Sequence, residues 1–257
     1  MEWYIYVAVI VAGTAAGFIN TLAGSGSLIT LPVLIFLGLP ANVANGTNRV
    51  GILFQNVVST ESFRRKGMMD MRGGLILSVP AIIGSVIGAQ IAVDLDEALM
   101  EKVIGALMIV MLVTMFVDPK RWVQGDMQHL TARPSVLQLL IFFAIGMYGG
   151  FIQAGVGIFL LAALVLNVGY NLVRANAVKN LIVLAFTISS LLVFIANDQV
   201  AWGIGLILAI GNSLGAWLAA RMAVKRGAQF VRWVVIIVVA VSAAQLLGVF
   251  EWVSQLF

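Results

Sequence analysis

Two basic side chains lie well inside apolar segments of this chain, where a charge needs a specific reason to be present. They are Arg49 and Lys179, and each has asparagines about one helical turn away or closer. A cation within the hydrocarbon of a membrane costs at least a few kcal/mol, so both should face the protein interior or a water-filled cavity. A buried cation with amide neighbours suits a small anion. The amides concerned are Asn45, Asn48, Asn176 and Asn180.

A glycine-rich break precedes each of these basic segments. The first reads AGSGS at residues 23–27 and the second reads AGVG at residues 154–157. Glycine permits tight turns, and non-helical backbone is tolerated at membrane depth where it lines a cavity. Neither break is a nucleotide-binding motif, because no strand precedes it and no Gly-Lys-Ser/Thr follows. The candidate substrate-binding residues here are Asn20, Gly24, Ser25, Gly26, Ser27, Gln153, Gly155 and Gly157.

The apolar segments that follow the breaks, at residues 27–39 and 156–168, are too short to cross a bilayer. About 13 residues give roughly 20 Å of helix, against a hydrocarbon core of roughly 30 Å. If each runs from the membrane interior to its own face, both helix starts lie at membrane depth. A helix start carries free N–H groups and about half a positive charge, which favours an anion.

Other chemistry finds little support in the residue types. The chain has no cysteine, and its one histidine, His129, lies in a polar stretch. We find no Ser/His/Asp set, HExxH motif or metal-ligand cluster, so we expect no catalytic residue, metal or cofactor. The acids nearest the apolar segments, Glu61, Asp94, Asp198 and Glu251, lie near expected helix ends. No deep carboxylate therefore identifies a coupling ion, and facilitated or potential-driven movement stays open.

Composition decides what kind of scaffold must position these residues. Of the 257 residues, 61% are hydrophobic and only 10% are charged, and the mean hydropathy is +1.06. A soluble globule of this size lacks the polar surface that such a composition would need. The chain is therefore expected to be an all-α polytopic protein of a lipid bilayer. Its net charge of +4 reflects loop sidedness and does not indicate nucleic-acid binding.

About ten transmembrane segments are expected, two of them the short ones. They cover residues 3–22, 27–39, 43–63, 73–93, 98–117, 135–153, 156–168, 172–196, 200–220 and 228–250. Whether the first and sixth segments span fully or form re-entrant hairpins with the short helices is left open. The glycine pairs Gly13/Gly17, Gly84/Gly88 and Gly211/Gly215 have the spacing of close helix-packing contacts.

The two halves of the chain resemble each other. Ala44-Asn45 aligns with Ala175-Asn176 at an offset of 175 − 44 = 131, and the two breaks align at the same offset. IGSVIGAQIA at 83–92 likewise matches IGNSLGAWLA at 210–219. Five segments, an odd number, make the second half enter the membrane from the opposite side, which gives an inverted-topology repeat. We expect a first repeat at 1–117, a cytoplasmic linker at 118–134 and a second repeat at 135–257.

Basic residues set the expected orientation. If the loop containing Arg64, Arg65 and Lys66 is cytoplasmic, the cytoplasmic loops and flanks hold 12 of the 15 Lys and Arg residues. By the positive-inside rule, both termini then lie outside, in the periplasm of a bacterial inner membrane. The residues left over include Arg49 and Lys179, which agrees with a buried role for both.

The stretch GxxxxLPVLIFLGLPANVANGTNRVGILFQN, with its shortened second copy, resembles the TauE/SafE family of sulfite-exporter-like membrane proteins. The most distinctive match is NGTNR at 45–49, with NAVKN at 176–180. The resemblance implies movement of sulfite, organosulfonates or related anions across the bacterial inner membrane, often outward. It carries Asn48, Arg49 and the first break over as pathway residues, followed by Asn176, Lys179 and Asn180. The second break departs from the first because it lacks the serines.

These features predict a transporter of small oxyanions, most favourably sulfite or an organosulfonate, working by alternating access. The anion would lie between the two helix starts near Arg49 and Lys179. The alternative is a membrane-embedded assembly factor or enzyme whose polar helix faces bind a lipid or partner protein. Amides on those faces would then serve as interhelical contacts, and the cations would extend to the interface. Either a monomer or a homodimer is compatible with the sequence.

Overall fold

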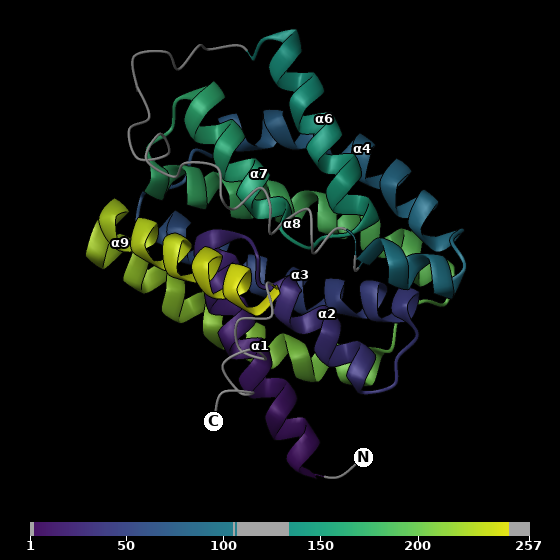
Figure 1. Cartoon of the computed structure of the whole chain (residues 1–257). Coiled ribbons are helices and arrows are strands. Elements are labelled where there is room, and N and C mark those ends of the chain that lie inside the picture. The colour runs from purple at the N-terminus through teal and green to yellow at the C-terminus, as the bar shows by residue number, and fades with distance from the viewer. Residues whose placement is uncertain (1–2, 105, 107–133, 247–257) are drawn as a thin grey trace.

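The computed structural model describes residues 3–104, 106 and 134–246, and every regular element in this part of the chain is helical. Figure 1 shows the arrangement. The helices are α1 (Trp3–Ala23), α2 (Ser27–Phe36), α3 (Ala41–Arg65), α4 (Met71–Val93), α6 (Val136–Phe151), α7 (Val156–Ala162), η3 (Ala163–Val168), α8 (Leu172–Ala196) and α9 (Trp202–Leu246). Helix α7 continues directly into the π-helical turns of η3.

The helix bounds follow the expected segments with one clear difference. The segments expected at 200–220 and 228–250 are not separated by a loop, because one helical element, α9, covers residues 202–246; residues 247–250 lie outside the described part of the chain. No proline lies between them, so no residue there lacks the N–H that a helix needs. Helix α2 ends at Phe36, a little before the expected residue 39. The segment expected at 98–117 lies mostly outside the described residues, as does all but the last residue of the expected linker at 118–134.

Four of the described helices are long and apolar enough to cross a membrane. They contain the stretches Ile5–Ala23, Met71–Val93, Leu172–Ala196 and Trp202–Arg226. Helix α3 matches α8 in length at 25 residues, but its many polar side chains lower its hydropathy. These spans agree with a multi-pass membrane protein.

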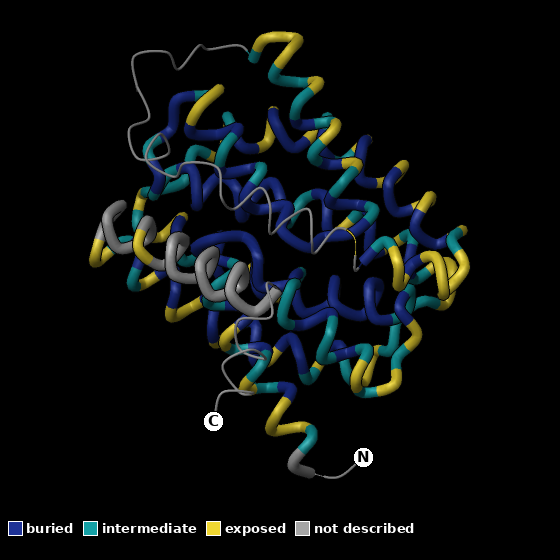
Figure 2. The backbone as a smooth tube through the Cα atoms, viewed as in Figure 1, coloured by how far each residue is buried: buried dark blue, intermediate teal, exposed yellow. Residues whose placement is uncertain are grey.

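The protein is apolar on its outside and polar at its centre, as the bilayer requires. On α4, Val79, Ile83 and Ile87 are exposed at four-residue spacing, which places them on one outward face. The buried residues gather at the centre, where α3 and α8 run (Figure 2). The polar side chains of these two helices are largely buried, including both Arg49 and Lys179. Polar groups buried inside a membrane protein mark functional or specific packing sites.

The helices form two groups, and each group contains one helix from the other half of the chain. Helices α1 and α3 pack with α9 and also with α2, whereas α4 packs with α6 and α8, and α7 packs with α6 and α8 (Figure 1). Helix α4 of the first half and helix α9 of the second half therefore each join the group built by the other half. Contacts between α3 and α8 connect the two groups. Residues from both halves of the sequence therefore meet at the centre of the molecule.

Small residues allow the tightest of these helix pairs. On α4, Gly84 and Gly88 lie against the α6 backbone, while Gly146 and Gly150 of α6 lie against the α4 backbone. A Cβ added at Gly88 would overlap the carbonyl group of the facing helix. Helices α1 and α9 use the same reciprocal arrangement, so the close packing expected of these glycine pairs is confirmed. The residues there are Gly13, Gly17, Gly211 and Gly215.

Candidate functional site

The two glycine-rich breaks meet inside the protein. Gly24, directly after α1, and Gly155, directly before α7, both have left-handed backbone conformations, with φ of 80° and 73°. A side chain is strained there, which explains glycine at both positions. The N–H of Gly157 donates to the carbonyl of Gly24 at 3.3 Å, and a Cβ added at either residue would overlap the other's backbone. The breaks are therefore in direct contact.

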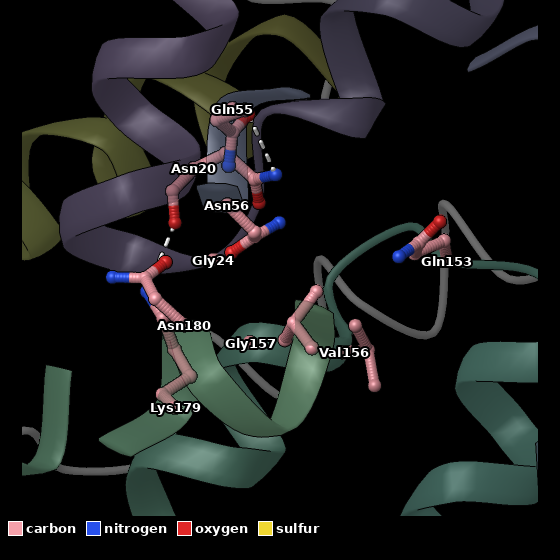
Figure 3. Close-up of a pocket in the computed structure, with 10 residues that line it drawn as sticks. Asn20, Gly24, Gln55, Asn56, Gln153, Val156, Gly157, Lys179 and Asn180 are labelled. Carbon is pink, nitrogen blue, oxygen red and sulfur yellow. Dashed lines mark hydrogen bonds between the residues drawn. The ribbon is translucent and has the colours of Figure 1, made fainter. Parts of the chain in front are cut away.

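A small pocket lies beside this contact (Figure 3). Its free volume is about 10 Å³, room for about one water molecule, so a larger ligand enters only if the pocket walls move apart. The two breaks and the helices α1, α3, α7 and α8 all contribute to its wall. The lining residues are Asn20, Gly24, Gln55, Asn56, Gln153, Val156, Gly157, Lys179, Asn180 and Val183.

Lys179 is the one basic residue in the pocket wall, and its side chain is 1% exposed. Its Nζ donates to the carbonyl oxygens of Asn20 and Thr21, at 2.9 and 2.8 Å. It also donates to Asn176 Oδ1 at 3.0 Å. Because α1 ends at Ala23, these carbonyls belong to the last turn of α1, and that of Asn20 also accepts from the N–H of Gly24 at 2.9 Å.

Arg49 makes the corresponding contacts with the end of α6. Its guanidinium donates to the carbonyl oxygens of Gly149 and Gly150, at 3.1 and 2.6 Å. Nη1 also donates to Ser190 Oγ at 2.8 Å. The guanidinium carbon lies 4.5 Å from the centroid of the Phe194 ring, within cation–π distance. Arg49 is fully buried and does not line the pocket.

The two cations thus bind helix ends reciprocally. Arg49 on α3 caps α6, the helix that precedes the second break, and Lys179 on α8 caps α1, the helix that precedes the first break. A helix C-terminus carries about half a negative charge, so a cation stabilises it and satisfies its free carbonyls. Each half of the chain therefore holds the broken helix of the other half in place.

Amide side chains connect each break to a long helix. Asn20 Nδ2 donates to Gln55 Oε1 at 3.2 Å, and Gln153 donates its Nε2 to the hydroxyl of Thr187. Within the described part of the chain, Gln55 Nε2 and Gln153 Oε1 are buried and find no hydrogen-bond partner. Buried polar atoms are normally satisfied. Free ones beside a pocket indicate that a ligand or water supplies the partner.

Comparison with known proteins agrees with this architecture. The family model for the sulfite exporter TauE/SafE matches residues 9–246, nearly the whole chain. The chain belongs to the TauE/SafE family. This is a family of membrane transporters, which agrees with the four apolar helices long enough to cross a membrane.

Curated relatives of this TauE/SafE protein carry the same general description. A probable membrane transporter protein, ORF9, from a Sinorhizobium species is 28% identical over 96% of this chain and 94% of its own length. A probable membrane transporter protein of Haemophilus influenzae is 28% identical over 91% of each chain. The Escherichia coli K12 protein YfcA, also a probable membrane transporter, is 29% identical over 90% of this chain and 86% of its own. No solved structure matches the chain significantly.

The TauE/SafE pocket contains part of the residue set expected from sequence. The expected residues that line it are Asn20, Gly24, Gln153, Gly157, Lys179 and Asn180. The expected residues that lie outside its lining are Arg49, Asn45, Asn48, Asn176, Ser25, Ser27, Gly26 and Gly155. Two of the residues outside the lining bind groups next to the pocket. Asn45 Nδ2 donates to the Phe151 carbonyl at the end of α6. Asn176 accepts from Lys179.

The serines and Asn48 lie close to the first break. Ser25 and Ser27 are buried, and their hydroxyls find no partner within the described residues. Asn48 Oδ1 accepts from the Thr30 hydroxyl at 2.6 Å, which ties α3 to α2. These groups therefore belong to the immediate surroundings of the α2 start and not to the pocket wall.

Two polar lining residues were not among the candidates from sequence. Gln55 and Asn56 lie on α3, about two turns beyond Arg49. The signal for them was present, because Gln55 falls seven residues after Asn48 and so on the same helical face. Val156 and Val183 also line the pocket, but a buried valine carries no functional signal in a single sequence.

Proposed function

We propose that this protein transports small oxyanions, most favourably sulfite or an organosulfonate, and that the anion binds in the pocket beside Lys179. The observation that carries the proposal is the position of this pocket. It lies where two broken helices meet in the protein interior, with a buried cation and unpartnered amide groups in its wall. Broken helices that meet near the membrane midplane form the substrate sites of many secondary transporters.

Charge supports an anion in preference to a cation. Three acceptor oxygens surround Lys179 Nζ, which matches the three N–H donors of a protonated ammonium. In that form Lys179 carries a full positive charge, whereas the helix end that it caps offers only about half a negative one. In the described part of the chain, the ion pairs join Glu61 to Arg64 and Arg65, far along α3 from the pocket. A net positive potential therefore remains beside Lys179, and an anion would neutralise it in a low-dielectric site.

We propose that transport proceeds by relative movement of the two helix groups around the pocket. Both groups supply lining residues, α1 and α3 from one and α7 and α8 from the other. An inside-negative potential favours outward movement of an anion by roughly 2.3 kcal/mol per charge per 100 mV. The family description, sulfite exporter, agrees with export across the inner membrane as the direction.

Sulfite flux from proteoliposomes with an imposed potential tests the proposal. We expect Lys179→Gln to reduce the flux by about tenfold or more, since about 1.4 kcal/mol of lost anion stabilisation corresponds to a factor of ten. Glutamine keeps donor groups for the Asn20 and Thr21 carbonyls but removes the charge. The matched control is Lys225→Gln, because Lys225 is exposed at the end of the candidate span in α9.

Undiminished sulfite flux in a folded Lys179→Gln protein would remove Lys179 from the pathway. Flux that is equally reduced in Lys225→Gln would indicate a surface-charge effect and not a binding site. The oxyanions sulfite, sulfate and an alkanesulfonate should also raise the thermal stability of the wild-type protein more than that of Lys179→Gln, because a bound ligand stabilises the folded state.

A further inference from the structure

Two asparagines in the pocket have their orientation fixed by the helices that carry them. Asn56 donates its Nδ2 to the carbonyl of Ile52 at 2.8 Å, and Asn180 donates its Nδ2 to the carbonyl of Asn176 at 2.9 Å. A carbonyl oxygen only accepts hydrogen bonds, so the nitrogen of each amide must face the helix backbone. The side-chain oxygen must then face the other way.

These two oxygens are hydrogen-bond acceptors without a donor. Asn56 and Asn180 are each 1% exposed and both line the pocket. Their Oδ1 atoms find no partner within the described residues. They come from α3 and α8, one from each helix group, as Figure 3 shows around the pocket. A buried acceptor left unpaired costs about 1–3 kcal/mol, so a bound ligand should supply donors here.

Most of the hydrogen-bond donors in the pocket, unlike these two acceptors, are already paired within the protein. Lys179 Nζ already donates to three protein oxygens and contributes mainly its charge. Gln55 Nε2 is a free donor within the described part of the chain, because the Oε1 of the same amide accepts from Asn20. The pocket thus offers one charge and one free donor to an anionic group, together with three free acceptors, the Oδ1 atoms of Asn56 and Asn180 and the Oε1 atom of Gln153.

Resting on the proposed function, we propose that the pocket selects small monoanions that carry a hydroxyl or amino hydrogen. Hydrogen sulfite and short hydroxyalkanesulfonates belong to this class. A bare dianion or a plain alkanesulfonate only accepts hydrogen bonds, so its binding leaves the Asn56 and Asn180 oxygens unpaired. The charged oxygens of a selected ligand lie beside Lys179 and Gln55, and its O–H or N–H donates to an asparagine oxygen.

A pair of probes with equal charge and equal heavy-atom count isolates the donor. These are 2-hydroxyethanesulfonate and propane-1-sulfonate, which differ by a hydroxyl in place of a methyl. Their affinities are measured by titration calorimetry on the purified full-length protein. We expect the hydroxylated probe to bind about tenfold or more tightly, because a site built to hydrogen-bond a hydroxyl rejects the analogue lacking it.

Substitution of the acceptors should remove this preference. We expect Asn56→Leu and Asn180→Leu each to weaken binding of 2-hydroxyethanesulfonate and to leave propane-1-sulfonate binding equal or tighter. Asn197→Leu is the matched control, since Asn197 makes the same bond to the carbonyl four residues earlier, at 2.8 Å, but is exposed. It should keep the wild-type preference.

The outcomes separate this inference from the proposed function. Equal wild-type affinities for the two probes, both lost in Lys179→Gln, overturn donor selection and leave anion transport standing. A preference that survives both leucine substitutions also overturns it, because the donor is then recognised elsewhere. Failure of both probes and of sulfite to bind overturns the proposed function itself. The wild-type comparison decides the matter even if a leucine variant does not fold.

Discussion

The burial of Arg49 and Lys179 could be predicted from the sequence, but the groups that they contact could not. Their burial at membrane depth follows from the apolar residues around them, and both are at most 1% exposed. Their partners are carbonyl groups at the ends of α6 and α1, about 100 and 160 residues away in the chain. Arg49 binds the end of α6 next to the second break, whereas Lys179 binds the end of α1 next to the first break and also lines the pocket.

Arg49→Met should destabilise the protein strongly. The substitution leaves the carbonyls of Gly149 and Gly150 buried without a donor, and such groups cost about 1–3 kcal/mol each, or about 2–6 kcal/mol together. Arg49→Lys should recover only part of this, because an ammonium cannot reproduce the fork that reaches both carbonyls and Ser190. Thermal unfolding in detergent measures both variants.

The control for this experiment is Arg65→Met on the same helix. Arg65 pairs with Glu61 at the surface, with 77% of its side chain exposed, and such pairs contribute at most about 1 kcal/mol. An Arg49→Met protein as stable as Arg65→Met would show that the contacts at the end of α6 are not needed to hold the second break.

At the scale of the elements, the two breaks supply part of the pocket wall. Their glycines could be recognised from sequence as sites of tight backbone turns, and Gly24 and Gly155 indeed have positive φ. The helices that follow are short, since α2 has 10 residues and α7 with η3 covers 156–168. The sequence predicted that the two helix starts come together, but it did not predict which residues touch, Gly24 and Gly157. This contact depends on how α1 and α7 approach in three dimensions.

Gly157→Ala should disrupt this contact. The added Cβ would overlap the Gly24 backbone, and relieving such an overlap costs about 1–3 kcal/mol or more in well-packed interiors. We expect a lower thermal unfolding temperature together with loss of sulfite flux, because separating the breaks alters the pocket between them. Both properties are measured on the same protein preparation.

Gly203→Ala provides the comparison, because a Cβ at Gly203 meets no atom within 4 Å. Alanine is favoured over glycine in helices by up to about 1 kcal/mol, so this variant should be as stable as the wild type or slightly more so. If Gly157→Ala behaves like Gly203→Ala in stability and flux, close contact between the breaks is not required.

At the scale of the whole molecule, the two halves of the sequence are interleaved. Helix α4 packs with the helices of the second half, and α9 packs with those of the first half. The reciprocal caps on α6 and α1 cross between the halves in the same manner. The internal likeness of the sequence indicates two similar units, but it does not indicate that each completes the other's helix group.

The orientation of the whole protein can be tested with single cysteines, because the natural chain contains none. We expect a membrane-impermeant maleimide to label Glu97→Cys and Asp198→Cys in intact spheroplasts. Arg65→Cys should react only after permeabilisation, since basic loops stay in the cytoplasm. All three positions are exposed. The reverse labelling pattern would place both termini inside the cell.

The sequence by itself determined the membrane environment, most helix positions, the two breaks and the two buried cations. These are local properties, set by hydropathy, by glycine and by the cost of charge in hydrocarbon. Tertiary structure decided which polar residues share the pocket, so that Gln55 and Asn56 join Lys179 while Arg49 lies apart against α6. The pattern along one helix predicts which residues are buried. Which of these buried groups meet depends on how α3 packs against α8 and on how the two breaks pack against each other.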